Sequence, residues 1–176
     1  MIAHKIELKA NNQQITYFKK ACGVARLAWN WGLSNWQEQY IEGLNPSGMS
    51  LKKEFNAIKK EEFPFVYDVT KYAVQQPFIQ LQEAFNRFFK KISGKPKFKK
   101  KNRSKDSFYI GGDQIKVERQ KVKIPNLGWV KLREDIRFQG KILNATVSRI
   151  ADRWFASSKT CCQCGSHKKD LALKDR

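Results

Sequence analysis

The residues best suited to chemistry are a basic strip at 90–105 and a group of cysteines near residue 161. The strip, KKISGKPKFKKKNRSK, carries nine Lys or Arg and no acidic residue. Its like charges, together with Gly94, Pro96 and few apolar groups, predict an extended, solvated segment. A phosphate backbone offers closely spaced negative charge, and a ring such as Phe98 stacks on bases. The strip therefore predicts nucleic-acid binding, with a solvated linker as the alternative.

The expected contacts of this strip are its cations and its aromatic ring. They are Lys90, Lys91, Lys95, Lys97, Phe98, Lys99, Lys100, Lys101, Arg103 and Lys105.

The charge of the whole chain favours the same partner. Its 176 residues include 35 Lys plus Arg and 16 Asp plus Glu, which gives a formal charge of +19. An anionic membrane is the rival surface, but no apolar run approaches the roughly 20 residues needed to span a bilayer. The first 12 residues also lack the apolar core of a signal peptide. We expect no membrane partner and a soluble, cytoplasmic protein.

The cysteines near the C-terminus have metal-like spacing. Cys161 and Cys164 stand two residues apart with Gly165 behind them, as in a zinc knuckle. Zinc takes four ligands, and a complete ribbon needs a second pair about 15–20 residues onward. Cys162 and His167 are alternative ligands, although adjacent residues rarely point at one ion. A redox dithiol uses the same spacing but normally begins a helix in a strand-helix-strand unit. We expect a zinc half site only.

The carboxylates do not predict a catalytic metal centre. Two-metal phosphodiester hydrolysis needs several converging carboxylates to hold Mg²⁺. The candidates are scattered among basic residues, where surface ion pairs are the simpler expectation: Asp106, Asp113, Glu118, Glu134, Asp135 and Asp152. We expect no catalytic Mg²⁺.

Hydrophobic periodicity divides the chain before the strip into a strand and several helices. Ile2 to Leu8 alternates apolar and polar residues, which predicts a strand that pairs with later strands and makes the helices an insertion. Spacing of three or four predicts a long helix over 13–40 and another over 66–91, which Pro77 kinks or restarts. A shorter helix with Ser50 as its N-cap lies between them. Together these segments predict a three- or four-helix bundle.

The aromatic residues of these helices are expected to pack in the core, because they recur at helical spacing. The exception is Trp31, which lies off the apolar stripe near Asn30 and Asn35, so exposure to a partner is the hypothesis there. Cys22 lies on the apolar face and is expected to be an inert buried thiol.

Short alternating runs after the strip, separated by Gly and Pro, predict a small antiparallel β-barrel. The runs are 107–110, 114–117, 121–124, 129–132, 136–138 and 144–150. The predicted fold is therefore α+β, with a small antiparallel barrel split by an inserted helical bundle and followed by a short incomplete zinc-ribbon tail. The predicted units are a first barrel strand at 1–10, a helical unit at 11–92, a basic linker at 93–106, the remaining barrel at 107–156 and the tail at 157–176.

Four segments carry a resemblance to a known family. They are LQEAFNRFFKKISGKPKFKKKNR at 81–103, IPNLGWVKLRE at 124–134, ATVSRIADRWFAS at 145–157 and SSKTCCQCG at 157–165. In this order they resemble the OrfB/TnpB proteins of bacterial insertion sequences, RNA-guided DNA nucleases related to type V CRISPR effectors. The resemblance implies that the barrel is wedge-like and that residues 11–92 form a helical recognition lobe. In the family these parts hold guide RNA, read a motif beside double-stranded target DNA and cradle the heteroduplex. The resemblance also implies a bacterial protein, associated with the nucleoid if it binds DNA.

The resemblance also shows what this sequence lacks. In the family, the stretch similar to RWFAS leads into an RNase-H-like domain with a catalytic Asp on a GIDLG-like motif and a Glu downstream. Here Phe155 to Ser158 runs directly into the SKTC knuckle, and Asp175 matches the spacer between the family's cysteine pairs. We expect an internally deleted and truncated, nuclease-deficient binder of RNA and DNA. The alternatives are a decayed transposon product without activity, a guide-independent basic DNA-binding protein, and a nuclease completed by another chain.

Overall fold

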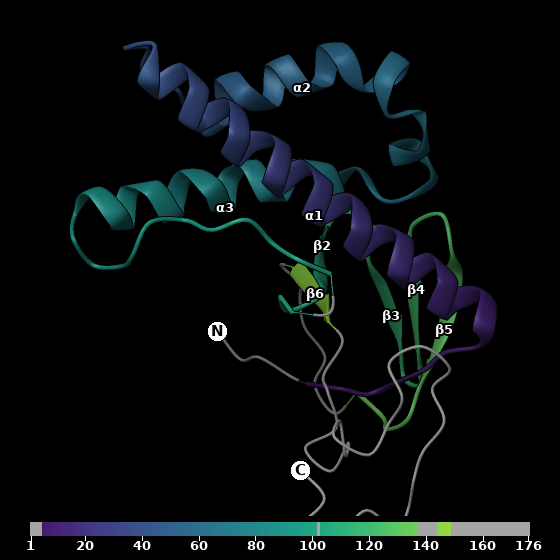
Figure 1. Ribbon diagram of the computed structural model, residues 1–176. Helices are drawn as coiled ribbons and strands as arrows, with labels where there is room; N and C mark the ends of the chain where they lie inside the picture. Colours follow the sequence, from purple (N-terminus) through teal and green to yellow (C-terminus); the bar gives the residue numbers. More distant parts are fainter. Residues whose placement is uncertain (1–4, 102, 137–143, 149–176) are drawn as a thin grey trace, which may run out of the picture.

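The computed structural model describes residues 5–101, 103–136 and 144–148 and confirms the α+β class (Figure 1). The helices are α1 (Asn12–Ile41), α2 (Gly48–Glu62) and α3 (Lys71–Phe89), with a short 3-10 helix, η1 (Pro64–Asp68), before α3. The strands are β1 (Leu8–Lys9), β2 (Ser107–Gly111), β3 (Lys116–Glu118), β4 (Lys121–Ile124), β5 (Gly128–Leu132) and β6 (Asn144–Ser148). None of the described helices is long and apolar enough to cross a membrane.

Helix α1 begins at a capping box, as its sequence permits. The Asn11 side chain accepts a hydrogen bond from the Gln14 amide at 2.8 Å, and the Gln14 side chain accepts from the Asn11 amide at 3.1 Å. These bonds satisfy two amides that have no partner inside the helix. Ten of its 30 residues are buried, and they recur along most of its length. The predicted long helix is confirmed.

The predicted cap of the second helix is one turn too late. Ser47, not Ser50, is the N-cap of α2, and Ser50 occupies the third helical position of a capping box. The two serines exchange side-chain and backbone hydrogen bonds, so both sequence positions suit a helix start. Helix α3 runs through Pro77 without restarting. Its buried face, which includes Pro77 and Phe78, packs on α1 and α2 and stabilises the helix despite the missing amide donor.

Aromatic side chains fill the space between the three helices. Phe55 of α2 and Phe78 of α3 are fully buried, and Trp36 of α1 stacks on Phe85 at 4.2 Å between centroids. The predicted exposure of Trp31 is wrong, because its ring packs edge-on against Phe55 at 5.1 Å and Phe78 at 6.2 Å. The apolar face of α1 is wide enough to include Trp31 because α2 packs beside the stripe that faces α3.

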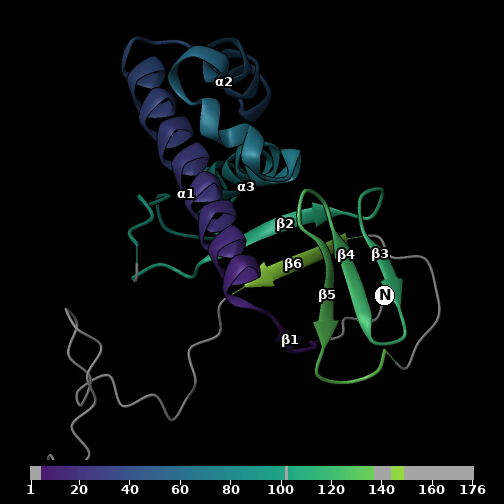
Figure 2. The same cartoon turned by 90° about the vertical axis from the view of Figure 1, so that its right-hand side faces the viewer.

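The strands form two antiparallel sheets, and the described part of the chain contains no closed barrel. One sheet has the order β1-β5-β4-β3, and β2 pairs with β6 in the other (Figure 2). Leu8 lies opposite Leu132, so the N-terminal strand joins the second half of the chain and the helices form an insertion, as predicted. The predicted barrel is wrong for these residues, because no strand pairing joins the two sheets.

Tyr17 joins the helices to the strands. Its hydroxyl donates to the Pro125 carbonyl at 2.8 Å and accepts from the Thr70 amide at 3.1 Å. Its ring meets Phe108 of β2 edge-on at 6.3 Å. Burial is the larger influence on this phenol and raises its pKa, although the bond from Thr70 acts in the opposite direction. One hydrophobic core therefore continues from the helical bundle into the sheets.

The contact between α2 and α3 at Gly48 gives a test of this packing. A Cβ on Gly48 would lie 2.4 Å from the Phe78 carbonyl oxygen and 3.0 Å from the Gln82 Cβ. We expect Gly48→Ala to lower the free energy of unfolding by about 1–3 kcal/mol, because backbone would have to shift. Urea denaturation would measure this loss. Gly94→Ala is the matched control, since nothing lies within 4 Å of its added Cβ. Equal stability of the two variants would contradict the packing at Gly48.

Candidate nucleic-acid interface

The basic strip leaves the C-terminal end of α3 and runs back past α1 to β2 (Figure 1). Lys91 has a positive φ of 57°, which turns the chain out of the helix. The Ile92 and Ser93 amides both donate to the Arg87 carbonyl, which closes this helix end. The strip is therefore led back to the molecule by a defined turn rather than leaving it.

Two neighbouring side chains of α1 hold the middle of the strip. The Asn30 carboxamide donates to the Lys99 carbonyl at 2.9 Å and accepts from the Lys99 amide at 2.8 Å. The Trp29 indole donates to the Lys97 carbonyl at 3.0 Å. The bonded residues 97 and 99 alternate with the exposed Phe98, as in an extended segment. The strip has no regular secondary structure over 94–100, and it is anchored to a helix here rather than free in solvent.

Lys99 differs from the other cations of the strip. It is half-buried, and its ammonium lies 4.1 Å from the centroid of the Trp29 ring. Burial lowers the pKa of this ammonium, while the ring face favours its charged form. Lys99 therefore contributes to the anchor, with its side chain against the ring instead of in solvent.

The other predicted contacts are exposed. They are Lys90, Lys91, Lys95, Lys97, Phe98, Lys100, Lys101, Arg103 and Lys105. Among the described residues, no cation of the strip is in an ion pair with a carboxylate. The strip thus presents positive charge that the described part of the protein does not neutralise locally.

The end of the strip is fixed by a turn and an ion pair. The Ser104 amide donates to the Lys100 carbonyl, and the Lys100 amide donates to the Ser104 hydroxyl, both at 2.9 Å. Arg26 binds Asp106 at 2.8 Å, and both side chains are about one-fifth exposed, at 21% and 22%. Arg26 shares one face of α1 with Trp29 and Asn30, because residues three and four apart are neighbours on a helix. That face therefore holds the strip at Lys97 and Lys99 and the chain just after it at Asp106.

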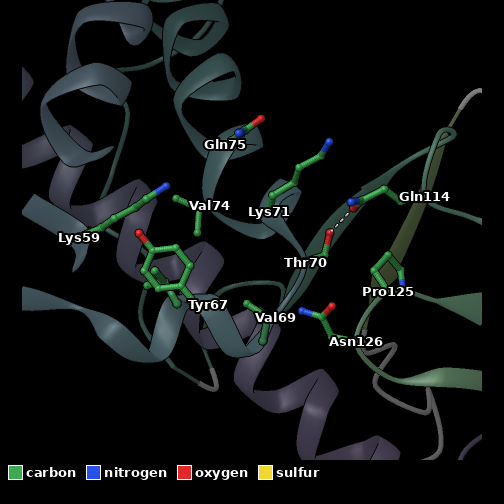
Figure 3. A pocket seen from close by; sticks show the side chains of 11 residues that line it. Lys59, Tyr67, Val69, Thr70, Lys71, Val74, Gln75, Gln114, Pro125 and Asn126 are labelled. Atoms are coloured by element: carbon green, nitrogen blue, oxygen red, sulfur yellow. Dashed lines mark hydrogen bonds between the residues drawn. The ribbon is translucent and has the colours of Figure 1, made fainter. Parts of the chain in front are cut away.

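A cavity of about 250 Å³ lies between η1, the start of α3 and the loops of the larger sheet (Figure 3). Its lining combines the lysines Lys59 and Lys71 with the amide side chains of Gln75, Gln114 and Asn126. Thr70, which is buried, donates to the Gln114 side chain at 2.9 Å and so fixes one of these amides (Figure 3). Lysines suit phosphates, and planar amides suit the edges of bases.

Several of the described carboxylates take part in ion pairs and hydrogen bonds, whereas Glu118 and Glu134 form no ion pair with a described residue. Asp113 accepts from the Tyr72 hydroxyl at 2.6 Å and pairs with Lys71 at 3.4 Å, and the bond from Tyr72 is the main reason that its pKa is lowered. Asp135 binds Arg119 at 2.9 Å. The ranges described here contain no group of three or more His, Cys, Asp or Glu residues that could hold a metal ion. Ion pairing is confirmed for Asp106, Asp113 and Asp135, whereas Asp152 lies outside the described residues.

Among the cysteine predictions, only the one for Cys22 concerns a residue that the structure describes. Cys161 and Cys164, the predicted zinc ligands, lie outside the described residues. Cys22 is buried, as predicted, and burial together with the charge of Asp106 raises its pKa to about 11, against the opposing effect of Arg26. At neutral pH this thiol is protonated and so a poor nucleophile.

Comparison with known proteins agrees with the resemblance in the sequence. Residues 1–44 match the profile of the family HTH_OrfB_IS605, described as a helix-turn-helix domain. Over 160 residues the chain is 26% identical to "Putative RNA-guided DNA endonuclease InsQ" of Escherichia coli (strain K12). These two matches confirm the resemblance to the OrfB/TnpB proteins. The alignment covers 90% of this chain but only 40% of that relative, so the chain spans about two fifths of its length.

The OrfB/TnpB profile covers a segment with a simpler structure than its description states. The described part of residues 1–44 contains β1 and a single uninterrupted helix, α1, with no turn between two helices. In this chain the segment therefore acts as one long support for the sheet, the strip and the other helices.

The residues that position the strip are not evident from the sequence. Asn30 stands beside Trp31, and Trp29 has the helical spacing of a core residue. A polar residue next to a tryptophan in the middle of an apolar helix was the available signal, because a half-buried amide needs hydrogen-bond partners. The cavity gave no signal, since its residues come from segments far apart in the sequence.

The ion pair at the end of the strip can be tested by removing one charge. We expect Asp106→Asn to lower the free energy of unfolding by about 1–2 kcal/mol, because Arg26 would lose its ionic partner at a mostly buried site. Asp68→Asn removes the exposed Lys20 pair, whose side chains are 58% and 55% exposed, and should cost less than about 0.5 kcal/mol. Urea denaturation of both variants measures the difference, and equal losses would contradict a structural role for Asp106.

Proposed function

We propose that this chain binds nucleic acid through the basic strip and does so with guide-type RNA and double-stranded DNA as partners. The observation that carries the proposal is the strip itself: all of its cations except Lys99 are exposed, and its backbone is anchored on α1. Fixed lysines opposite a phosphate backbone release counterions on binding and give affinity without sequence preference. The relationship to OrfB/TnpB proteins supports the choice of partners.

RNA is the partner proposed for the strip. Phe98 is 48% exposed and lies between Lys97 and the anchored Lys99. Alternating cations and an aromatic ring suit an unpaired strand, whose phosphates and bases are both accessible. In a regular duplex the bases are stacked on one another and offer no free face to this ring.

The cavity is the proposed contact for DNA. Gln75 and Asn126 would hydrogen-bond to base edges, while Lys59 would approach a phosphate, because Lys71 is already paired with Asp113. This division assigns most sequence recognition to base pairing with the RNA, and assigns to the protein the shape of the duplex and a short neighbouring motif.

We propose that the described residues bind nucleic acid without cutting it. Cleavage by two metal ions requires several carboxylates that converge without competing partners. Asp106, Asp113 and Asp135 instead neutralise nearby Arg or Lys residues. The proposed role is occupancy of a site, which would block other proteins from it.

Purification of the tagged protein from its own host, followed by sequencing of the bound RNA, tests this function. We expect a single enriched transcript that ends in a segment complementary to a DNA target. Heterogeneous RNA would favour a guide-independent basic DNA-binding protein. RNA no higher than in a mock preparation, together with no affinity for DNA, would leave a folded transposon product without this activity.

Neutralisation of the strip gives a quantitative test. We expect the triple variant Lys97→Gln, Lys100→Gln and Lys101→Gln to bind single-stranded RNA more weakly, with a salt slope of log affinity reduced by about 2, since each lost phosphate contact removes about 0.7. Fluorescence anisotropy over a range of salt concentrations measures both quantities.

The control for total charge is the variant Lys19→Gln, Lys53→Gln and Lys60→Gln, whose lysines are exposed on α1 and α2. It should keep most of the wild-type slope. The role of the strip would be rejected if the two triple variants lost affinity and slope equally.

A further inference from the structure

We propose that Asn30 is a positioning residue for RNA binding, which holds the middle of the basic strip in an extended conformation before RNA arrives. The inference rests on the proposed function and adds a residue that itself carries no charge. A basic segment free in solvent must be ordered when it binds, and that ordering reduces affinity. An anchor formed in the free protein removes part of this cost.

The chemistry of the Asn30 side chain suits this task. A carboxamide has a donor and an acceptor in one plane, so it can satisfy the amide and the carbonyl of one residue together. Asn30 does so with Lys99, at 2.9 Å and 2.8 Å. These bonds join residues 69 positions apart and fix the backbone of the strip directly, whatever its side chains contact.

Trp29 adds a second attachment between α1 and the strip, beside that of Asn30. Its indole N–H holds the Lys97 carbonyl at 3.0 Å, and its ring lies against the Lys99 ammonium at 4.1 Å. Lys97 and Lys99 are therefore both held by their backbone, while the side chains of Lys97, Phe98 and Lys100 stay exposed.

The anchor also keeps the strip positive. Asn30 is neutral, and Lys99 has an aromatic face as its neighbour where a carboxylate would cancel its charge. Asp106, the first acidic residue after the strip, is bound to Arg26 of α1. The strip is thus fixed in place without the loss of charge that ion pairs to its own lysines would cause.

The test compares Asn30→Ala with Asn35→Ala in the whole protein, using labelled single-stranded RNA of mixed sequence. Asn35 is also partly buried on α1, but among the described residues its side chain bonds only to the Trp31 carbonyl, one turn away. We expect Asn30→Ala to bind about tenfold more weakly, because two hydrogen bonds that order the strip are lost. Its salt slope should equal that of the wild type, because no charge is removed. Asn35→Ala should bind like the wild type.

A second variant and a second measurement protect the test against a general folding defect. Trp29→Phe removes the N–H donor to Lys97 but keeps an aromatic ring, and should weaken binding about threefold, as expected for one lost bond. Hydrogen exchange of the Lys99 amide in the free protein should be slow in the wild type and fast in Asn30→Ala, with the protection of core amides unchanged.

Two outcomes would overturn the inference alone. One is wild-type affinity in Asn30→Ala after the Lys99 amide has lost its protection. The other is a salt slope of Asn30→Ala that falls as far as that of the triple lysine variant. That result would mean that phosphate contacts themselves are lost, and not only the order of the strip. If the wild type and the triple lysine variant bound RNA equally, the proposed function would fail, and this inference would fail with it.

Discussion

Helix α1 is held at its start by the sheets, in its middle by the basic strip and toward its end by α2 and α3. Tyr17 makes the first connection, Asn30 the second, and the stack of Trp36 on Phe85 belongs to the third. At about 1.5 Å per residue, a helix of 30 residues is about 45 Å long, which is enough to reach all of them. A break in α1 would separate the helices from the sheets, which the strip also connects. The continuity of α1 is therefore the constraint on which the rest of the described structure depends.

The strip shows how a strongly charged segment can be ordered without being neutralised. Repulsion among its cations favours an extended chain, and burial of unpaired backbone groups would be costly. Both conditions are met by hydrogen bonds from Trp29 and Asn30 to the backbone, which leave the lysine side chains of the strip other than Lys99 in solvent. A set of ion pairs would order the segment equally well, but it would cancel the charge that a phosphate backbone recognises.

The parts of the fold that could be predicted are those that depend on local sequence patterns. Periodicity located α1 and α3, and the strand-like residues before Asn11 indicated that β1 pairs with a later strand, which Leu8 and Leu132 confirm. Closure of a barrel depends on which strands pair and in what register. The alternation of apolar and polar residues within a strand indicates neither. The anchor depends on Asn30 meeting Lys99, a contact between distant residues that no periodicity records. The sequence therefore indicates which residues of the strip carry charge. That Lys99 belongs to the anchor on α1 is visible only in the structure.

Helix α1 connects the strip to the cavity, so the two surfaces have a fixed arrangement in which to act together. The cavity is bordered by Thr70 and Pro125, and both are bonded to the hydroxyl of Tyr17. Tyr17 and Asn30 lie on one continuous helix, so the two surfaces are separated by a rigid element rather than by a linker. A nucleic acid that contacted both would meet cations and amides at a fixed separation. Binding at one surface would then place the second partner without a further loss of conformational freedom, which is the advantage of a preformed site over a flexible basic tail.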